Sequence, residues 1–206
     1  MALDFDGTLV GCRDRQLAAL ERALDGRPAP DLDAFWRAKT TGASTVAALT
    51  GLGVSEPDAR AIATRWVEVV EDRDLLALDP PVPELDAALT AIAAAGLDAA
   101  IVTARRDAAA VRAQIDALGL RPAAGVHVVS PASAAAEKAV VLAELGAVGF
   151  VGDTESDAAA AAAAGIPFAA VAGGQRDEQW LARHVAGAVH PSVLHAVRAL
   201  LETKER

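Results

Sequence analysis

From residue 82 onward, short apolar segments alternate with segments that have the length and composition of helices. Strands are predicted at residues 99–103, 126–130, 148–152 and 167–172, and helices at 83–95, 107–118, 134–145, 157–164 and 191–202. Strands that alternate with helices in this way form a parallel sheet with helices on both faces. We therefore predict an α/β core, whose ligands should bind beyond the carboxyl ends of the strands.

Residues 12–81 break this alternation, because the segment has helical patterns only. Helices are predicted at residues 13–24, 31–39, 44–49 and 56–72, with proline-rich segments between and after them. An all-helical block placed directly after the first strand is most simply an inserted cap. We predict a core domain of residues 1–11 and 82–206 and a cap domain of residues 12–81, with hinges near Gly11 and near Pro80–Pro83.

Composition limits the class of protein. The 206 residues are 53% hydrophobic and 23% charged, which is typical of a globular chain with an ample core. No apolar run approaches the roughly 20 residues that span a bilayer, and the first residues do not resemble a signal peptide. The single cysteine, Cys12, excludes an internal disulfide and fits a cytoplasmic location. We expect its thiol to be packed rather than catalytic.

The formal net charge of −9 argues against nucleic acid as a partner, because nucleic-acid-binding proteins present a basic face. A small anionic ligand stays compatible with this charge. A bound divalent cation and a few local lysine or arginine side chains can reverse the field inside one cleft.

Two aspartates stand at the end of the first apolar segment, in Asp4-Phe5-Asp6-Gly7-Thr8-Leu9. Residues i and i+2 of an extended segment point the same way, so Asp4 and Asp6 should project together from the carboxyl end of a strand. The alternative is a strand that runs into an ordinary turn, since Asp-Gly is a common turn dipeptide. Only three residues precede Asp4, so we expect a frayed first strand or a chain whose true start lies upstream.

Further polar residues follow the other predicted strands. Thr103 ends one strand, Lys138 lies after the next, and Gly152-Asp153-Thr154-Glu155-Ser156-Asp157 follows a third. Structural alternatives exist for each: a helix N-cap for Thr103, although Asp107 is better placed for it, a solvated lysine, and acidic residues that cap a helix. Lysine is scarce in this chain, which favours a specific role for Lys138.

In their order along the chain, these residues resemble the four motifs of the haloacid dehalogenase superfamily. The motifs are an aspartate pair, a strand-end Thr or Ser, a Lys, and a GDxxxD segment. The resemblance covers the whole chain, although residues 130–138 lack the K-P-x-P form common in one branch. The helical insert resembles the small cap of the phosphoglycolate-phosphatase-like branch. The resemblance implies a Rossmann-like core.

The resemblance also implies roles for the acidic residues. Asp4 would be the nucleophile that forms an aspartyl-phosphate, and Asp6 would be the general acid and then the general base. Mg²⁺ would be the cofactor, with Asp4, the backbone carbonyl of Asp6, and Asp153 as ligands. Asp157 would orient the waters of the metal.

The remaining core positions would bind the phosphoryl group. By resemblance Thr103 would donate a hydrogen bond to it, and Lys138 would neutralise charge on the nucleophile and the phosphate. From their position alone, the backbone N–H groups of Gly7 and Ala104 are further candidate donors.

Substrate contacts are expected on both sides of the cleft. Arg105 and Arg106 follow Thr103 on the core side. On the cap side, residues 35–44 resemble the cap loop that contacts substrate, and Arg37 and Lys39 are the candidates there. A solvated helix end with a buried tryptophan is an equally good interpretation of this segment.

The sequence therefore predicts a Mg²⁺-dependent phosphatase that acts on a small phosphorylated metabolite, in an oligomeric state that the sequence does not define. One alternative is a phosphomutase, although no His or Lys pair for sugar binding is evident in the cap. Another is a degenerate member that binds phosphorylated ligands or a partner without turnover. A dehalogenase is disfavoured, because its nucleophile does not need a second aspartate at position 6. The four histidines form no metal-ligand pattern, and we expect surface or packing roles for them.

Overall fold

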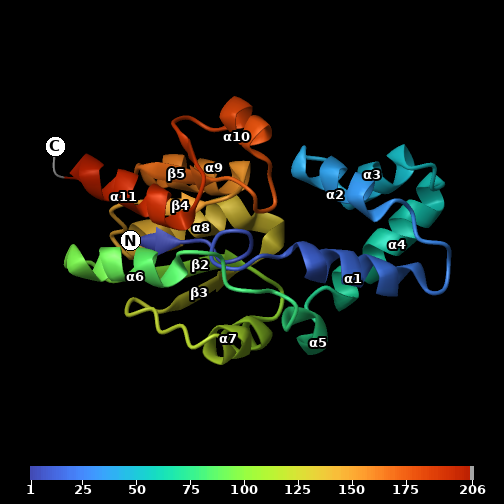
Figure 1. Cartoon of the computed structure of the whole chain (residues 1–206), viewed down its shortest axis with the longest axis horizontal. Helices are drawn as coiled ribbons and strands as arrows, with labels where there is room; N and C mark the ends of the chain where they lie inside the picture. Colours follow the sequence, from blue (N-terminus) through green and yellow to red (C-terminus); the bar gives the residue numbers. More distant parts are fainter. Residues whose placement is uncertain (205–206) are drawn as a thin grey trace.

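A computed structural model describes residues 1–204, and over this range the centre of the molecule is a six-stranded parallel sheet. The strands are β1 (Ala2–Leu3), β2 (Ala100–Ala104), β3 (Val126–Val129), β4 (Phe150–Gly152), β5 (Phe168–Val171) and β6 (Val189–His190). Their order is β3-β2-β1-β4-β5-β6, and every pairing is parallel. The predicted α/β class with a Rossmann-like sheet is confirmed (Figure 1).

Helices cover both faces of the sheet because alternate strand residues point to opposite sides. Leu3 and Val151 pack into the cluster that contains α6 (Leu85–Ala94), α7 (Ala108–Ala117) and α11 (Val193–Lys204). Their neighbours Ala2 and Phe150 pack into the cluster that contains α8 (Ala134–Glu144) and α9 (Glu155–Ala164). Helices α8 and α9 pack extensively against each other through alanine-rich surfaces.

Strand β1 is short but not frayed. Ala2 and Leu3 are fully buried, and each pairs with β2 on one side and with β4 on the other. The backbone N–H of Asp4 extends this pairing, since it donates to the carbonyl of Val151 at 2.8 Å. The central position of the strand therefore compensates for its length, and the residues that follow it start from a rigid base.

Residues 13–76 form a separate group of helices at one end of the molecule (Figure 1). They are α1 (Arg13–Leu24), α2 (Leu32–Thr40), α3 (Thr45–Gly51), α4 (Glu56–Val69) and α5 (Arg73–Leu76). Asp31, Ser44 and Ser55 begin three of them as N-caps, each accepting a hydrogen bond from a first-turn N–H. The helices pack around a core of their own that includes Leu20 and Phe35.

The two connections to this helical group lie side by side. The N–H of Gly11 donates to the carbonyl of Pro80 at 2.8 Å, and the N–H of Val82 donates to the carbonyl of Leu9 at 3.0 Å. This pairing and the separate core support our proposal that residues 12–81 are a cap and that residues 1–11 and 82–206 are the core.

The end of the sheet holds two elements that sequence patterns did not predict. Helix α10 (Glu178–His184) and strand β6 follow β5, and β6 pairs with β5 through only two residues.

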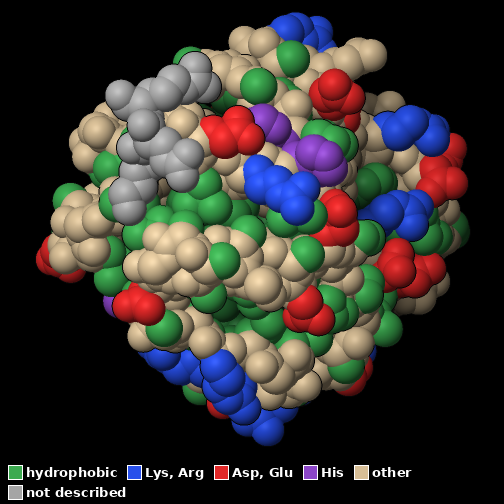
Figure 2. Space-filling view, turned by 60° about the vertical axis from the view of Figure 1, so that its left-hand side comes forward, with side chains coloured by type: hydrophobic (Ala, Val, Ile, Leu, Met, Phe, Trp, Pro, Cys, Tyr) green, Lys and Arg blue, Asp and Glu red, His purple; other side chains and the backbone are tan. Residues whose placement is uncertain are grey.

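Among residues 1–204, no helix is long and apolar enough to cross a membrane. The histidines are half-buried or exposed, and histidine side chains are visible among interspersed acidic and basic ones on the surface in Figure 2.

Candidate active site

The carboxyl ends of β1, β2 and β4 bring the predicted motifs together. Asp4 follows β1, Thr103 lies near the end of β2, and Asp153 follows β4. Lys138 reaches the same place from α8, and all four side chains are buried. These positions are brought together by the parallel sheet and not by sequence proximity, as expected for sites of open α/β sheets.

Lys138 joins two of the acidic residues. Its Nζ donates to Oδ1 of Asp4 at 2.7 Å and to Oδ1 of Asp157 at 2.6 Å, and its side chain is 4% exposed. The ammonium also lies 5.6 Å from the centre of the Phe150 ring. Burial opposes the charged form, but Asp157 and Asp4 outweigh it and raise the pKa of Lys138 above its ordinary value. Lys138 is therefore a fixed positive charge next to Asp4.

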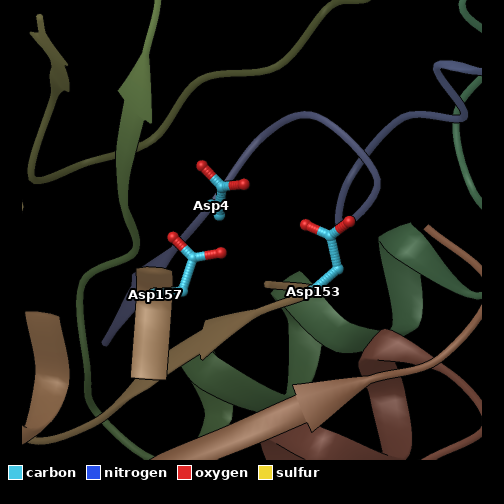
Figure 3. A group of neighbouring side chains, drawn as sticks. All are labelled: Asp4, Asp153 and Asp157. Carbon is cyan, nitrogen blue, oxygen red and sulfur yellow. The ribbon is translucent and has the colours of Figure 1, made fainter. Parts of the chain in front are cut away.

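Asp4, Asp153 and Asp157 surround one space, and one oxygen of each lies within 4.8 Å of the others (Figure 3). Burial, opposed by Lys138 and assisted by Asp157, raises the pKa of Asp4 to about 7. Burial also raises the pKa of Asp153, with Asp4 and Asp157 adding to the effect. Three carboxylates against one ammonium leave an excess of two negative charges when all are ionised. This excess and the all-oxygen donor set fit a hard divalent cation such as Mg²⁺.

The two oxygens of Asp157 have other partners already. Oδ1 accepts from Lys138, and Oδ2 accepts from the hydroxyl of Thr154 at 2.6 Å and from its N–H at 3.2 Å. Thr154 and Asp157 thereby form the capping box that begins α9. Asp157 can therefore cap α9 and still adjoin the acidic space, and its engaged oxygens favour the predicted orienting role over direct ligation of a cation.

Asp153 is held by backbone that approaches it closely. Its Oδ1 accepts from the Thr8 hydroxyl at 3.3 Å, and its Oδ2 accepts from the N–H of Gln175 at 2.5 Å. A Cβ atom at Gly7 or at Gly174 would overlap with the Asp153 carboxylate, and Gly7 also has a φ of +79°. Both glycines are therefore required for space, and Gly7 also for its left-handed backbone.

Asp6 does not belong to the three-carboxylate group, although it stands two residues after Asp4. Its Oδ2 accepts from Nε of Arg105 at 2.5 Å, and its Oδ1 accepts from Nη2 of Arg105 at 2.6 Å and from Nη2 of Arg15. Burial favours the neutral form, but Arg105 and Arg15 outweigh it and lower the pKa of Asp6. The two aspartates of the motif therefore have separate environments.

Some predicted substrate contacts are engaged elsewhere. The N–H of Gly7 donates to the carbonyl of Val10 at 2.8 Å, so in this structure Gly7 supplies space rather than a donor. Arg105 is committed to Asp6, although its Nη1 is buried without a hydrogen-bond partner among the described residues. Ala104 is half-buried at the end of β2. The competing N-cap interpretation of Thr103 is excluded, because Asp107 caps α7.

The two cap candidates differ in their surroundings. The side chain of Arg37 is 69% exposed, with its Nη2 3.9 Å from the Asp31 carboxylate. Lys39 is half-buried, with Nζ 3.3 Å from the Thr45 hydroxyl and 5.7 Å from the centre of the Trp66 ring. Burial, with a smaller contribution from a nearby arginine, lowers the pKa of Lys39 to about 8. Lys39 is thus the better placed of the two for a buried contact.

Sequence reasoning missed the residues that join the proposed cap to the candidate site. Arg15 and Asp79 are buried charged residues next to Asp6, and Gln114 contacts Asp79 from α7. The signal for Arg15 was its position in the buried stripe of α1, where it precedes Ala19 by four residues. No comparable pattern marks Asp79.

Comparison with known proteins identifies the family of the chain. The model of the haloacid dehalogenase-like hydrolases matches residues 1–165. The chain therefore belongs to the haloacid dehalogenase-like hydrolase family. Comparison with curated proteins finds no match.

Several solved structures share the fold. A hydrolase of the haloacid dehalogenase-like family from Streptococcus pneumoniae has a TM-score of 0.75 at 17% identity, covering 96% of each chain. A "predicted phosphoglycolate phosphatase" from Haemophilus somnus has a TM-score of 0.70 at 17% identity, also covering 96% of each chain. A subfamily IA hydrolase from Geobacter sulfurreducens has a TM-score of 0.65 at 20% identity, covering 97% of this chain and 94% of its own. At these identities the likeness establishes the fold.

Proposed function

We propose that the chain is a Mg²⁺-dependent phosphatase that hydrolyses a small phosphorylated metabolite through an aspartyl-phosphate on Asp4. The observation that carries the proposal is the placement of Asp4, which accepts a hydrogen bond from the buried ammonium of Lys138 and shares an acidic space with Asp153 and Asp157. A nucleophilic carboxylate needs charge neutralisation around it before it can approach an anionic phosphoryl group. Lys138 and a divalent cation would together supply that neutralisation.

The reaction would run in two displacements at phosphorus. In the first, an oxygen of Asp4 bonds to phosphorus, the bond to the ester oxygen breaks, and Asp6 gives a proton to the departing alkoxide. Because the two arginines lower the pKa of Asp6, it would bind this proton only when the anionic substrate lies beside it. In the second, Asp6 takes a proton from water as the water oxygen bonds to phosphorus. The bond between phosphorus and Asp4 then breaks, which releases inorganic phosphate and restores both aspartates.

Other residues would bind the phosphoryl group and the cofactor. The Thr103 hydroxyl would donate to a phosphoryl oxygen at the end of β2, and Lys138 would neutralise a second one. Asp4, the backbone carbonyl of Asp6, and Asp153 would hold Mg²⁺, with Asp157 orienting its waters. The bound cation would neutralise charge that develops on the phosphoryl oxygens.

The cap contacts the core on two sides of the proposed site, which favours a small substrate enclosed away from bulk water. On one side, the Glu71 carboxylate accepts from the N–H groups of Arg106 at 3.0 Å and Asp107 at 2.8 Å. On the other, the N–H of Asp177 donates to the carbonyl of Thr40 at 3.1 Å. Lys39, one residue before Thr40, would then contact a polar or anionic group of the metabolite.

The test is release of phosphate from p-nitrophenyl phosphate, with Mg²⁺ and with EDTA. We expect activity that depends on Mg²⁺ and that falls at least about a thousandfold in Asp4→Asn, because the nucleophile is lost. Asp14→Asn is the matched control, since Asp14 is exposed on α1 and should leave the rate unchanged. Wild-type activity in Asp4→Asn would refute the assignment of the nucleophile. No phosphate release from this ester or from a panel of metabolite phosphates would favour a binding protein without turnover.

A further inference from the structure

Asp6 of the proposed site belongs to a buried network of four charged side chains, with Arg105, Arg15 and Asp79 as the other members. The side chains of the two arginines are 4% exposed, that of Asp6 is 10% exposed, and that of Asp79 is fully buried. Arg15 bridges the two aspartates, because its Nη2 donates to Asp6 and its Nε donates to Oδ2 of Asp79 at 2.7 Å. Two carboxylates and two guanidinium groups balance, so the network needs no cation.

The network crosses the boundary between the proposed cap and core. Arg15 lies in the first turn of α1, four residues after Gly11, and Asp79 directly precedes Pro80, whose carbonyl pairs with Gly11. Asp6 and Arg105 belong to the core. Arg15 is thus the point where the cap contacts a proposed catalytic carboxylate directly.

Further contacts fix the orientation of Arg15. Its Nη1 donates to the carbonyl of Val70 at 3.2 Å. The amide of Gln114 donates to Oδ2 of Asp79 at 3.0 Å and to the carbonyl of Leu76 at 3.0 Å, which holds the acceptor of Arg15 in place. A guanidinium with three of its nitrogens engaged in a fixed planar fork has little freedom to rotate.

Arg15 makes the two oxygens of Asp6 unequal. A carboxylate oxygen has two lone-pair sites in its plane. Arg105 donates one hydrogen bond to each oxygen of Asp6, and Arg15 adds a second to Oδ1. Both sites of Oδ1 are then engaged, and one site remains on Oδ2. Without Arg15, Arg105 alone would hold the carboxylate with a site left on each oxygen.

We infer that Arg15 is a positioning residue for proton transfer to the leaving group, which it directs through Oδ2 of Asp6, and that Asp79 orients Arg15. The inference rests on the proposed function, in which Asp6 is the general acid. It adds that this acid is correctly oriented only when α1 of the cap is seated against the core.

The test compares two aryl esters of similar shape, phenyl phosphate and 2,4-dinitrophenyl phosphate. Phenolate is a basic leaving group that needs a proton in the transition state, whereas dinitrophenolate leaves without one. For Arg15→Gln, we expect kcat/KM to fall about 10- to 100-fold with phenyl phosphate and less than about threefold with 2,4-dinitrophenyl phosphate. kcat/KM is the readout because it reports the steps up to loss of the phenolate.

Arg22→Gln is the matched control, since Arg22 is an exposed arginine of the same helix with two carboxylate partners of its own. It should leave both rates unchanged. Arg15→Lys retains a cationic donor and should recover part of the rate with phenyl phosphate. Asp79→Asn should show the same preference as Arg15→Gln with a smaller loss. If Arg15→Gln does not fold, these two variants decide the question in the same way.

An equal loss with both esters in the folded variants would overturn the inference, because a purely structural change would slow both reactions alike. An unchanged rate with phenyl phosphate would overturn it as well. Failure of the proposed function is distinct from both results, since the wild-type enzyme would then release phosphate from neither ester.

Discussion

Replacement of Lys138 by methionine removes the ammonium that lies 2.7 Å from Asp4 and 2.6 Å from Asp157 while keeping most of the side-chain volume against Phe150. Both carboxylates stay buried and lose a cationic partner. Loss of one member of a buried ion pair costs about 3–5 kcal/mol, because an uncompensated charge is left inside the protein. We expect the free energy of unfolding of Lys138→Met in EDTA at pH 7 to fall by about that amount.

Mg²⁺ should reduce this loss, since the cation binds the same acidic space. At one hundred times its Kd, a ligand that binds only the folded state adds about 2.7 kcal/mol of stability. Lower pH should reduce the loss too, because protonation removes the uncompensated charge of the carboxylates. Activity would not recover with stability, because the fixed positive charge next to Asp4 is gone.

Urea unfolding in EDTA and in MgCl2 measures these differences. Arg121→Met is the matched control, since Arg121 is 68% exposed and its only ion pair among the described residues is with exposed Asp116. This variant should unfold like the wild type. If Lys138→Met lost less than about 1 kcal/mol in EDTA, the reasoning from an uncompensated buried charge would be refuted.

Three further predictions concern the metal, the glycines and the cap. Asp153→Asn should abolish the increase in melting temperature that Mg²⁺ gives the wild type; an unchanged increase would exclude Asp153 as a ligand. Gly7→Ala should destabilise the fold and lower activity far more than Gly26→Ala, because both glycines have positive φ but only Gly7 adjoins Asp153. Equal effects of the two variants in circular dichroism melts and in the phosphatase assay would contradict this. For substrates with a second anionic group, KM should rise as pH increases through about 8, where Lys39 loses its charge, and this rise should be absent in Lys39→Met; a rise that persists in that variant would assign it to another group.

The core was predictable because its signals are local. Buried strands such as residues 100–104 consist of short runs of β-branched residues and alanine. The helices between them end at glycines such as Gly165, which has a φ of +70°. The sequence order of the motifs then predicted which strand ends carry polar side chains. Strand β6 escaped prediction because two residues cannot show an alternating pattern.

The different environments of Asp4 and Asp6 were less predictable. Spacing alone placed Asp4 and Asp6 on one side of a strand, but the chain turns at Gly7, and Asp6 pairs with arginines from α1 and from the end of β2. These arginines stand 9 and 99 residues away in the sequence. Long-range ion pairs of this kind depend on how α1 and the end of β2 are placed against each other, which no local pattern encodes.

The loop between β5 and α10 contacts both Asp153 of the proposed metal site and the proposed cap. The N–H of Gln175 donates to the Asp153 carboxylate, and the N–H of Asp177 donates to the carbonyl of Thr40. Trp180 lies so close to Gly42 that a Cβ atom at Gly42 would overlap with its ring. Exchange of residues 12–81 for the corresponding segment of a relative would therefore remove the partners of this loop and disrupt its packing. Directed evolution of substrate choice should randomise residues 174–180 together with the cap, because each surface is shaped to the other.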